Sequence, residues 1–133
     1  MGYSAFLERM GEVNDLLNAK SILSWDAKTM MPPGGADTRA KQLATLTVVA
    51  RDHLVADETR RLLEQAEAET ANLDSDSVER TICGQVREAI EYHLRIPTAL
   101  VHKRAEVGSI GQHIWAKARA ESDFASFETV LEE

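Results

Sequence analysis

Apolar residues recur three or four positions apart along almost the whole chain, the spacing that predicts amphipathic α-helices. The first helix is expected from about residue 5 to residue 26. Its apolar stripe is formed by Phe6, Met10, Val13, Leu17 and Leu23. Residues 31–35 read Met-Pro-Pro-Gly-Gly, and because proline cannot continue a helix while glycine allows a reversal, a sharp corner should follow.

A second helix should leave this corner, with Asp37 or Thr38 as its N-cap. Its apolar line consists of Leu43, Leu46, Ala50 and Leu54. Asp57 offers the N-cap of a third helix. The apolar face of that helix is narrow and consists of Leu62, Leu63 and Ala66. We therefore expect the third helix to be short and peripheral.

Residues 72–77 are polar and predict a turn before a fourth helix, which should run from residue 78 to near Arg95. The stripe of the fourth helix is formed by Val78, Ile82, Val86, Ile90 and His93. Pro97 fits the first turn of a fifth helix, where its missing N–H costs nothing.

The fifth helix carries Gly108 and Gly111, and no strand or Gly-x-Gly pattern precedes them. Close helix packing is therefore their expected purpose. Ser122 or Asp123 should restart the chain. The last apolar face consists of Phe124, Phe127 and Leu131 and breaks off after barely three turns, as expected either of an excised segment of a longer protein or of a shortened homologue.

Together these elements predict an all-α protein, an antiparallel helical bundle of about five to six helices in a single domain over residues 1–133. The net charge of −7 and the dispersed basic residues argue against nucleic-acid binding. No apolar run is long enough to cross a bilayer, and no signal pattern opens the chain, so we expect a cytoplasmic protein without membrane contact. Cys83 lies among apolar residues and should be a small buried side chain.

The four histidines, His53, His93, His102 and His113, are the first candidates for chemistry. None begins a His-Glu-x-x-His motif, and none ends a Glu-x-x-His motif. No nucleophile elbow, P-loop or Cys-x-x-Cys is present, although spacing alone does not exclude a serine triad. We therefore predict no catalytic and no metal-binding residue in this chain.

Two polar clusters stand out instead. Asp26 could pair with Arg39, and Gln42 lies one turn beyond Arg39 on the same helix face. Trp115 and Arg119 are four positions apart, so the guanidinium can lie over the indole. We favour helix packing over ligand binding for both clusters. An unrelated small helical enzyme using Asp26, Arg39 or Trp115 stays a minor hypothesis.

Several short motifs resemble the N-terminal region of the carboxypeptidase Taq family. These motifs are Leu-Ser-Trp-Asp at 23–26, Met-Pro-Pro-Gly-Gly-Ala at 31–36, Arg39, Gln-Leu-Ala-Thr-Leu at 42–46, Ile-Pro at 96–97, Leu-Val at 100–101, His-x-Trp-x-x-Ala-Arg-Ala at 113–120, Asp-Phe at 123–124, and Phe127. Their order, spacing and residue types all agree with the family. The sequence departs from the family's usual residues at Ala27, Lys28, Arg51 and Thr129.

The resemblance implies a helical metallocarboxypeptidase fold whose N-terminal helices form one wall of a groove. In such enzymes a downstream His-Glu-x-x-His helix and a later glutamate bind zinc or cobalt, and these positions have no counterpart among the present residues. We therefore expect no cofactor in this chain. The residues expected to serve as structural or groove-wall positions are Trp25, Asp26, Arg39, Gln42, Trp115 and Arg119.

The functional prediction is the N-terminal helical portion of a carboxypeptidase Taq-like enzyme, inactive alone. Its partner would be the catalytic part or a second copy, since family members are commonly homodimers. The alternative is a stand-alone helical dimerisation or interaction module without peptidase activity.

Overall fold

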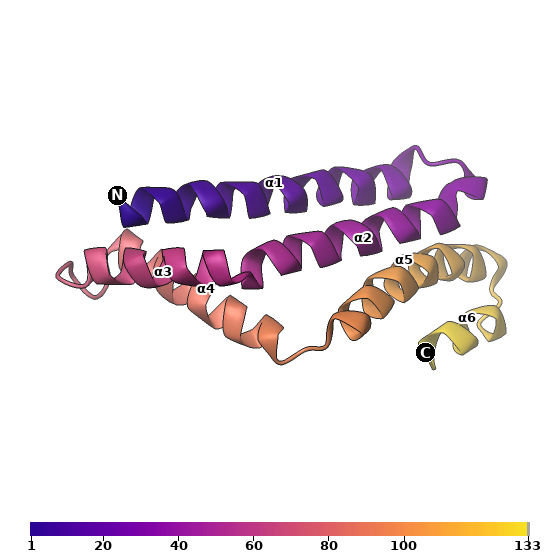
Figure 1. Cartoon of the computed structure of the whole chain (residues 1–133). Helices are drawn as coiled ribbons and strands as arrows, with labels where there is room; N and C mark the ends of the chain where they lie inside the picture. Colours follow the sequence, from indigo (N-terminus) through magenta and orange to yellow (C-terminus); the bar gives the residue numbers. More distant parts are fainter. Residues whose placement is uncertain (133) are drawn as a thin grey trace. The chain divides into compact units, whose positions relative to one another are not determined.

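The computed structural model describes residues 1–132, and helices make up most of them (Figure 1). In chain order the elements are α1 (Gly2–Thr29), the 3-10 turn η1 (Pro33–Gly35), α2 (Ala36–Val55), α3 (Asp57–Thr70), α4 (Val78–Leu94), α5 (Thr98–Glu121) and α6 (Ala125–Leu131). No strand occurs within residues 1–132. The all-α prediction, with about six helices, is therefore confirmed. None of these helices is long and apolar enough to span a bilayer.

Two predicted N-caps are wrong. The turn η1 leads directly into α2, so Asp37 and Thr38 already lie inside the first turn of that helix. Asp57 is the first residue of α3, and Ala56 takes the N-cap position without a side-chain hydrogen bond. An acidic residue in the first turn still complements the helix dipole, which explains why the local signal resembles a cap. Ser77, by contrast, accepts a hydrogen bond from the Arg80 amide and caps α4.

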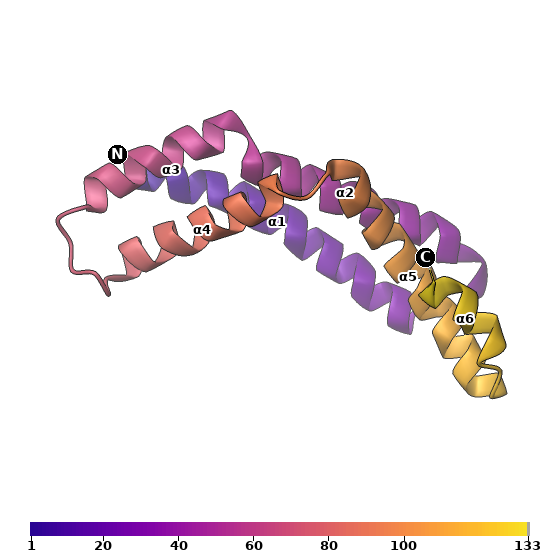
Figure 2. The ribbon, with the colours of Figure 1, turned by 90° about the horizontal axis from the view of Figure 1, so that it is seen from below.

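The chain folds into two compact units, and each unit consists of two segments that are separate in the sequence. Unit 1 contains residues 1–17 and 49–97, and unit 2 contains residues 18–48 and 98–133. Within unit 1, α4 returns along α3 after the turn at residues 71–77 (Figure 2). The single domain over 1–133 stays a prediction.

The core of unit 1 gathers side chains from α1, α3 and α4. Its buried members are Phe6, Leu63, Ala66, Cys83 and Ile90. The peripheral position expected for α3 is wrong, because this helix supplies two of these five residues. Part of the buried face of α3 consists of Thr59, Thr70 and the small Ala66. Because threonine is polar and alanine is small, the apolar pattern in the sequence makes this face look narrower than it is.

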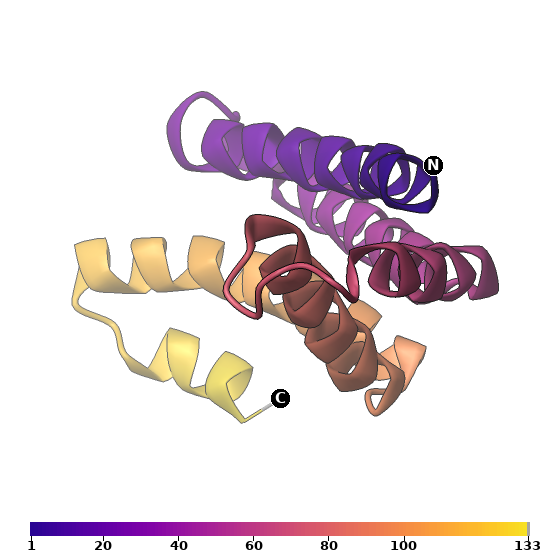
Figure 3. The same ribbon diagram turned by 90° about the vertical axis from the view of Figure 1, so that its left-hand side faces the viewer.

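In unit 2, α6 lies against α5 (Figure 3). Gly111 lies at this contact, where an added Cβ would approach Val130 Cγ1 to 2.9 Å. Close packing is thus confirmed for Gly111. It is wrong for Gly108, because nothing lies within 4 Å of a Cβ placed there.

The reversal between α5 and α6 depends on Ser122, which has a positive φ of 55°. The Asp123 amide donates to the Ala118 carbonyl at 2.9 Å, and the Ser122 amide donates to the Arg119 carbonyl at 3.4 Å. This pair of bonds is the Schellman pattern that ends many helices, usually with glycine in the left-handed position. The motif directs the chain back toward α5 and thereby places Phe124 near Trp115.

Candidate functional site

The first predicted cluster lies at the α1–α2 corner, inside unit 2. Arg39 Nη1 donates to Asp26 Oδ2 at 2.5 Å and to the Leu23 carbonyl at 2.8 Å. Arg39 Nε donates to Gln42 Oε1 at 3.0 Å. The expected Asp26–Arg39 pair and the Arg39–Gln42 contact are therefore both present. These hydrogen bonds join the C-terminal part of α1 to the first turns of α2, which matches a structural corner.

Trp25 directly precedes Asp26 in α1. Its side chain is 62% exposed, and its carbonyl accepts a hydrogen bond from Thr29 Oγ1 at 2.9 Å. The tryptophan is therefore available at the surface of unit 2. A ligand-binding or groove-wall role for Trp25, Asp26, Arg39 and Gln42 stays a prediction.

The second predicted cluster lies at the end of α5. The guanidinium carbon of Arg119 lies 5.4 Å from the centre of the Trp115 ring, within cation–π range. Both residues line an open hollow of about 300 Å3 within unit 2. The complete lining is Trp115, Ala118, Arg119, Ser122, Phe124 and Phe127. The spacing of Trp115 and Arg119 predicted their contact. Phe124 and Phe127 lie beside these two residues because the chain reverses direction at Ser122.

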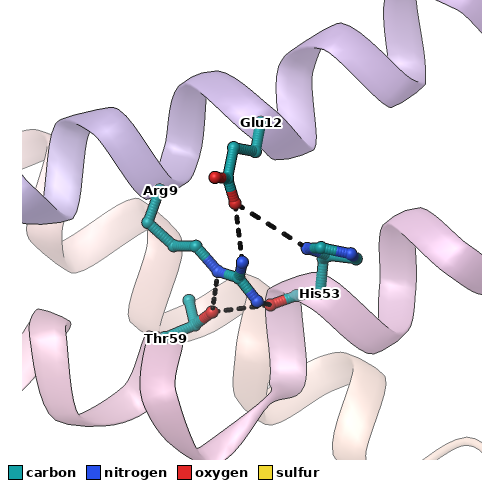
Figure 4. A network of polar contacts seen from close by, with 4 residues as sticks. All are labelled: Arg9, Glu12, His53 and Thr59. Atoms are coloured by element: carbon teal, nitrogen blue, oxygen red, sulfur yellow. Dashed lines mark hydrogen bonds and ion pairs between the residues drawn. The ribbon is translucent and has the colours of Figure 1, made fainter.

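A third cluster in unit 1 has no counterpart in the sequence analysis (Figure 4). Arg9 Nε donates to Thr59 Oγ1 at 3.0 Å, and Arg9 Nη1 donates to Glu12 Oε2 at 2.6 Å. Thr59 Oγ1 in turn donates to the His53 carbonyl at 2.6 Å, and Arg9 Nη2 reaches the same carbonyl at 3.5 Å. His53 Nδ1 lies 3.9 Å from Glu12 Oε2. Because Thr59 is fully buried, this network ties the end of α2 to α1 and α3.

A fourth polar contact, also in unit 1, involves Arg51. Its Nη2 donates to the carbonyl oxygens of His93 at 2.9 Å and of Ile96 at 2.8 Å. Both acceptors lie at or just beyond the C-terminal end of α4, where carbonyl groups lack partners within the helix. A cation at this position also complements the negative end of the helix dipole. Arg51, a residue of α2, therefore caps the C-terminal end of α4.

Arg51 also affects the imidazole of His93. Burial, and secondly the positive charge of Arg51, lower the pKa of His93 from its ordinary value of 6.5. The buried Nδ1 atom of His93 has no hydrogen-bond partner among residues 1–132. The folded chain therefore favours the neutral imidazole.

This pKa shift predicts a loss of stability in mild acid. Above about pH 6.5 His93 is neutral in both folded and unfolded chains and contributes no pH dependence. As the pH falls from there toward the lower pKa of the folded state, the unfolded chain binds the proton first, so the free energy of unfolding decreases. Urea unfolding between about pH 7.5 and about pH 5 should show this loss, and His93→Gln should reduce it. His102→Gln, which removes a more exposed imidazole, should leave the loss unchanged.

The donor set does not fit a zinc or cobalt site. Within residues 1–132 no group of three or more His, Cys, Asp or Glu side chains is placed to hold a metal ion. Glu12 and His53 approach one another but supply only two donors, whereas zinc in proteins takes three or four protein ligands. No chemical step can be derived from a metal held by these side chains. The expectation of a chain without cofactor or metal ligands stays a prediction.

Comparison with known proteins gives consistent findings. The family described as "Carboxypeptidase Taq (M32) metallopeptidase" matches residues 5–133. Thermostable carboxypeptidase 1 of Thermus thermophilus is 27% identical over 125 residues, which are 94% of this chain and 24% of that protein. Thermostable carboxypeptidase 1 of Pyrococcus furiosus is 29% identical over 115 residues, covering 86% of this chain and 22% of that protein.

A solved structure described as "The Structure of CHT" matches 98% of this chain and 26% of that chain, with a TM-score of 0.65 and 29% identity. The present chain thus spans about a quarter of the length of the relatives it matches.

Proposed function

The chain belongs to the carboxypeptidase Taq (M32) metallopeptidase family, and from this premise we propose that it supplies the N-terminal helical portion of a metallocarboxypeptidase fold. The activity of such a complete protein would be removal of C-terminal residues from peptides. The present residues would act as scaffold and groove wall for that reaction. By themselves they would neither hold the catalytic metal nor cleave a peptide.

The observation that carries this proposal is the unequal coverage of the structural match. Almost the whole chain superimposes on a solved structure, yet it accounts for only 26% of that structure's chain. The sequence contains no His-Glu-x-x-His motif, which zinc peptidases of this type use to place two imidazoles and a base on one helix face. Both facts favour a role as the scaffold of a metallocarboxypeptidase fold over a role as a complete peptidase.

A second candidate is a helical module that associates with itself or with another protein. The exposed fractions of Trp25 and Phe124, 62% and 64%, favour this candidate because large apolar side chains at a surface mark contact sites. A symmetric dimer would be the simplest assembly. A cytoplasmic location is consistent with either candidate and is part of the proposal.

A peptidase assay tests the first candidate. We expect the purified chain to release no C-terminal residue from a peptide in the presence of added zinc or cobalt. Thermostable carboxypeptidase 1 of Thermus thermophilus serves as the positive control under the same conditions. Metal-dependent release by the present chain, abolished by a chelator, would overturn the proposal.

Analytical ultracentrifugation separates the two candidates further. A monomer over a wide range of concentrations counts against self-association, whereas a concentration-dependent dimer without peptidase activity favours the module.

A further inference from the structure

The hollow between α5 and α6 is an exposed aromatic surface within unit 2. Trp115, Phe124 and Phe127 line it, and the Phe124 and Phe127 rings pack edge to face with their centres 6.4 Å apart. Trp115 is 43% exposed and Phe124 is 64% exposed, so much of this surface faces solvent. Large aromatic side chains at a surface gain free energy when apolar groups cover them, and such surfaces mark contact sites between proteins.

Arg119 gives the hollow its charge. Within residues 1–132 Arg119 forms no ion pair, and its guanidinium carbon lies 5.4 Å from the centre of the Trp115 ring. A guanidinium over an aromatic face still carries N–H groups along its edge, which can donate to a carboxylate of another molecule. The other residues that line the hollow are uncharged, so the hollow is locally positive although the whole chain carries a net charge of −7. A partner that covers the hollow should therefore bring a negative charge.

The walls and the size of the hollow limit how it can be covered. Its walls are two helices, and a further helix laid along such a pair is a common way to bury an exposed helix face. A volume of about 300 Å3 accommodates one large side chain, and an anchor of that kind carries much of the affinity of many protein interfaces. Residues three or four positions apart lie on one face of a helix, so an apolar anchor and a carboxylate at this spacing can reach the hollow and Arg119 together.

We propose that the hollow is a docking site for a helical segment of another protein. An apolar side chain of that segment enters the space between Trp115, Phe124 and Phe127, and an aspartate or glutamate side chain one turn away accepts hydrogen bonds from Arg119. The recognised carboxylate belongs to a side chain inside the partner's sequence, and no chain end takes part. The net charge of −7 favours a different protein over a second copy of this chain, because two copies repel one another.

This proposal names a partner for the second candidate function, the interaction module, and does not depend on the peptidase assay. Titration of the full chain with two synthetic helical peptides tests it. Both peptides are N-acetylated and C-amidated, so neither has a free terminal carboxylate. Each carries one leucine in an alanine-rich helix; the first has a glutamate four positions after the leucine, and the second has a glutamine there.

We expect the glutamate peptide to bind with a dissociation constant on the order of 1 mM and the glutamine peptide about fivefold more weakly. In NMR spectra the indole N–H signal of Trp115 should move, and that of Trp25 should stay; Trp115→Phe assigns the two signals. A glutamate peptide with alanine in place of the leucine should not bind, because it lacks the anchor.

Arg119→Gln should abolish the preference for the glutamate peptide while leaving weak binding of both peptides. Arg104→Gln removes another exposed arginine of α5 and should leave the preference intact, which makes it the matched control. Arg119→Lys keeps the charge without the fork and should give an intermediate preference, so the test survives if the glutamine variant fails to fold.

The proposal is overturned if neither leucine peptide binds, if both bind equally, or if the preference for the glutamate peptide survives Arg119→Gln. Undiminished binding of the peptide without leucine would overturn it as well. Analytical ultracentrifugation of the same variants distinguishes the partner: a dimer of the chain that Arg119→Gln dissociates would show that a second copy occupies the hollow, against the proposal. A dimer that Arg119→Gln leaves intact, together with failure of the peptides, would overturn the docking site while favouring the self-associating module.

Discussion

Replacing Phe6 by alanine is expected to lower the free energy of unfolding by about 3–5 kcal/mol, as found when a buried phenylalanine is truncated. Phe6 is 0% exposed and lies in the core of unit 1 with Leu63, Ala66, Cys83 and Ile90. Truncation would lose the transfer free energy of the ring and leave a cavity between three helices, which the buried side chains around it can fill only in part. A loss of this size is a large fraction of the total stability of an ordinary domain.

Urea unfolding followed by circular dichroism measures this effect, and Leu7→Ala is the matched control. Leu7 is the next residue of α1 but is 41% exposed, so its truncation should cost much less. Similar losses for both variants would show that Phe6 does not occupy a packed core. Phe6→Leu, which preserves more of the volume, should cost less than Phe6→Ala.

The sequence predicted those features that arise within one or two helical turns or within one short corner. Helix existence follows from the apolar periodicity, and the contact between Trp115 and Arg119 follows from their i, i+4 spacing. The Asp26–Arg39 pair could be anticipated because only the Pro-Pro-Gly-Gly corner separates the two helices that carry it. In each case the residues meet because of local geometry.

Contacts between distant residues could not be found in this way. Arg9 meets Thr59 fifty positions further along the chain, and no periodicity relates the two. The burial of Thr59 was equally hidden, because a threonine on a helix face usually indicates solvent or a cap. The hollow beside Trp115 depends on the backbone of Ser122, where a serine occupies a conformation that normally favours glycine.

Arg51 also makes contacts that no local pattern in the sequence predicts. The residues around it in the sequence do not indicate a partner for its guanidinium. The structure places its guanidinium on the carbonyl oxygens of His93 and Ile96, more than forty positions away. No spacing or motif in the sequence links Arg51 to these two carbonyl groups.

Arg51→Gln is expected to lower the free energy of unfolding by about 2–4 kcal/mol. The Arg51 side chain is 9% exposed, and its two hydrogen bonds from a charged donor to carbonyl groups are each worth about 1.5–3 kcal/mol. The shorter, neutral glutamine would leave at least one carbonyl oxygen at the end of α4 without this donor. Asp52→Asn removes only the exposed partner of Arg51 and should change the stability by less than about 1 kcal/mol.

Arg51→Gln should also change the pKa of His93. This second measurement distinguishes loss of the Arg51 contact from a general loss of stability. The charge of Arg51 is the second cause of the lowered His93 pKa, after burial. In Arg51→Gln the His93 pKa, followed by NMR titration of the folded protein, should therefore rise toward its ordinary value while staying below it. Asp52→Asn should produce no such rise. An unchanged His93 pKa in folded Arg51→Gln would mean that the guanidinium does not lie at the end of α4 in solution, because a cation bonded to the His93 carbonyl cannot be removed without easing protonation of the adjacent imidazole.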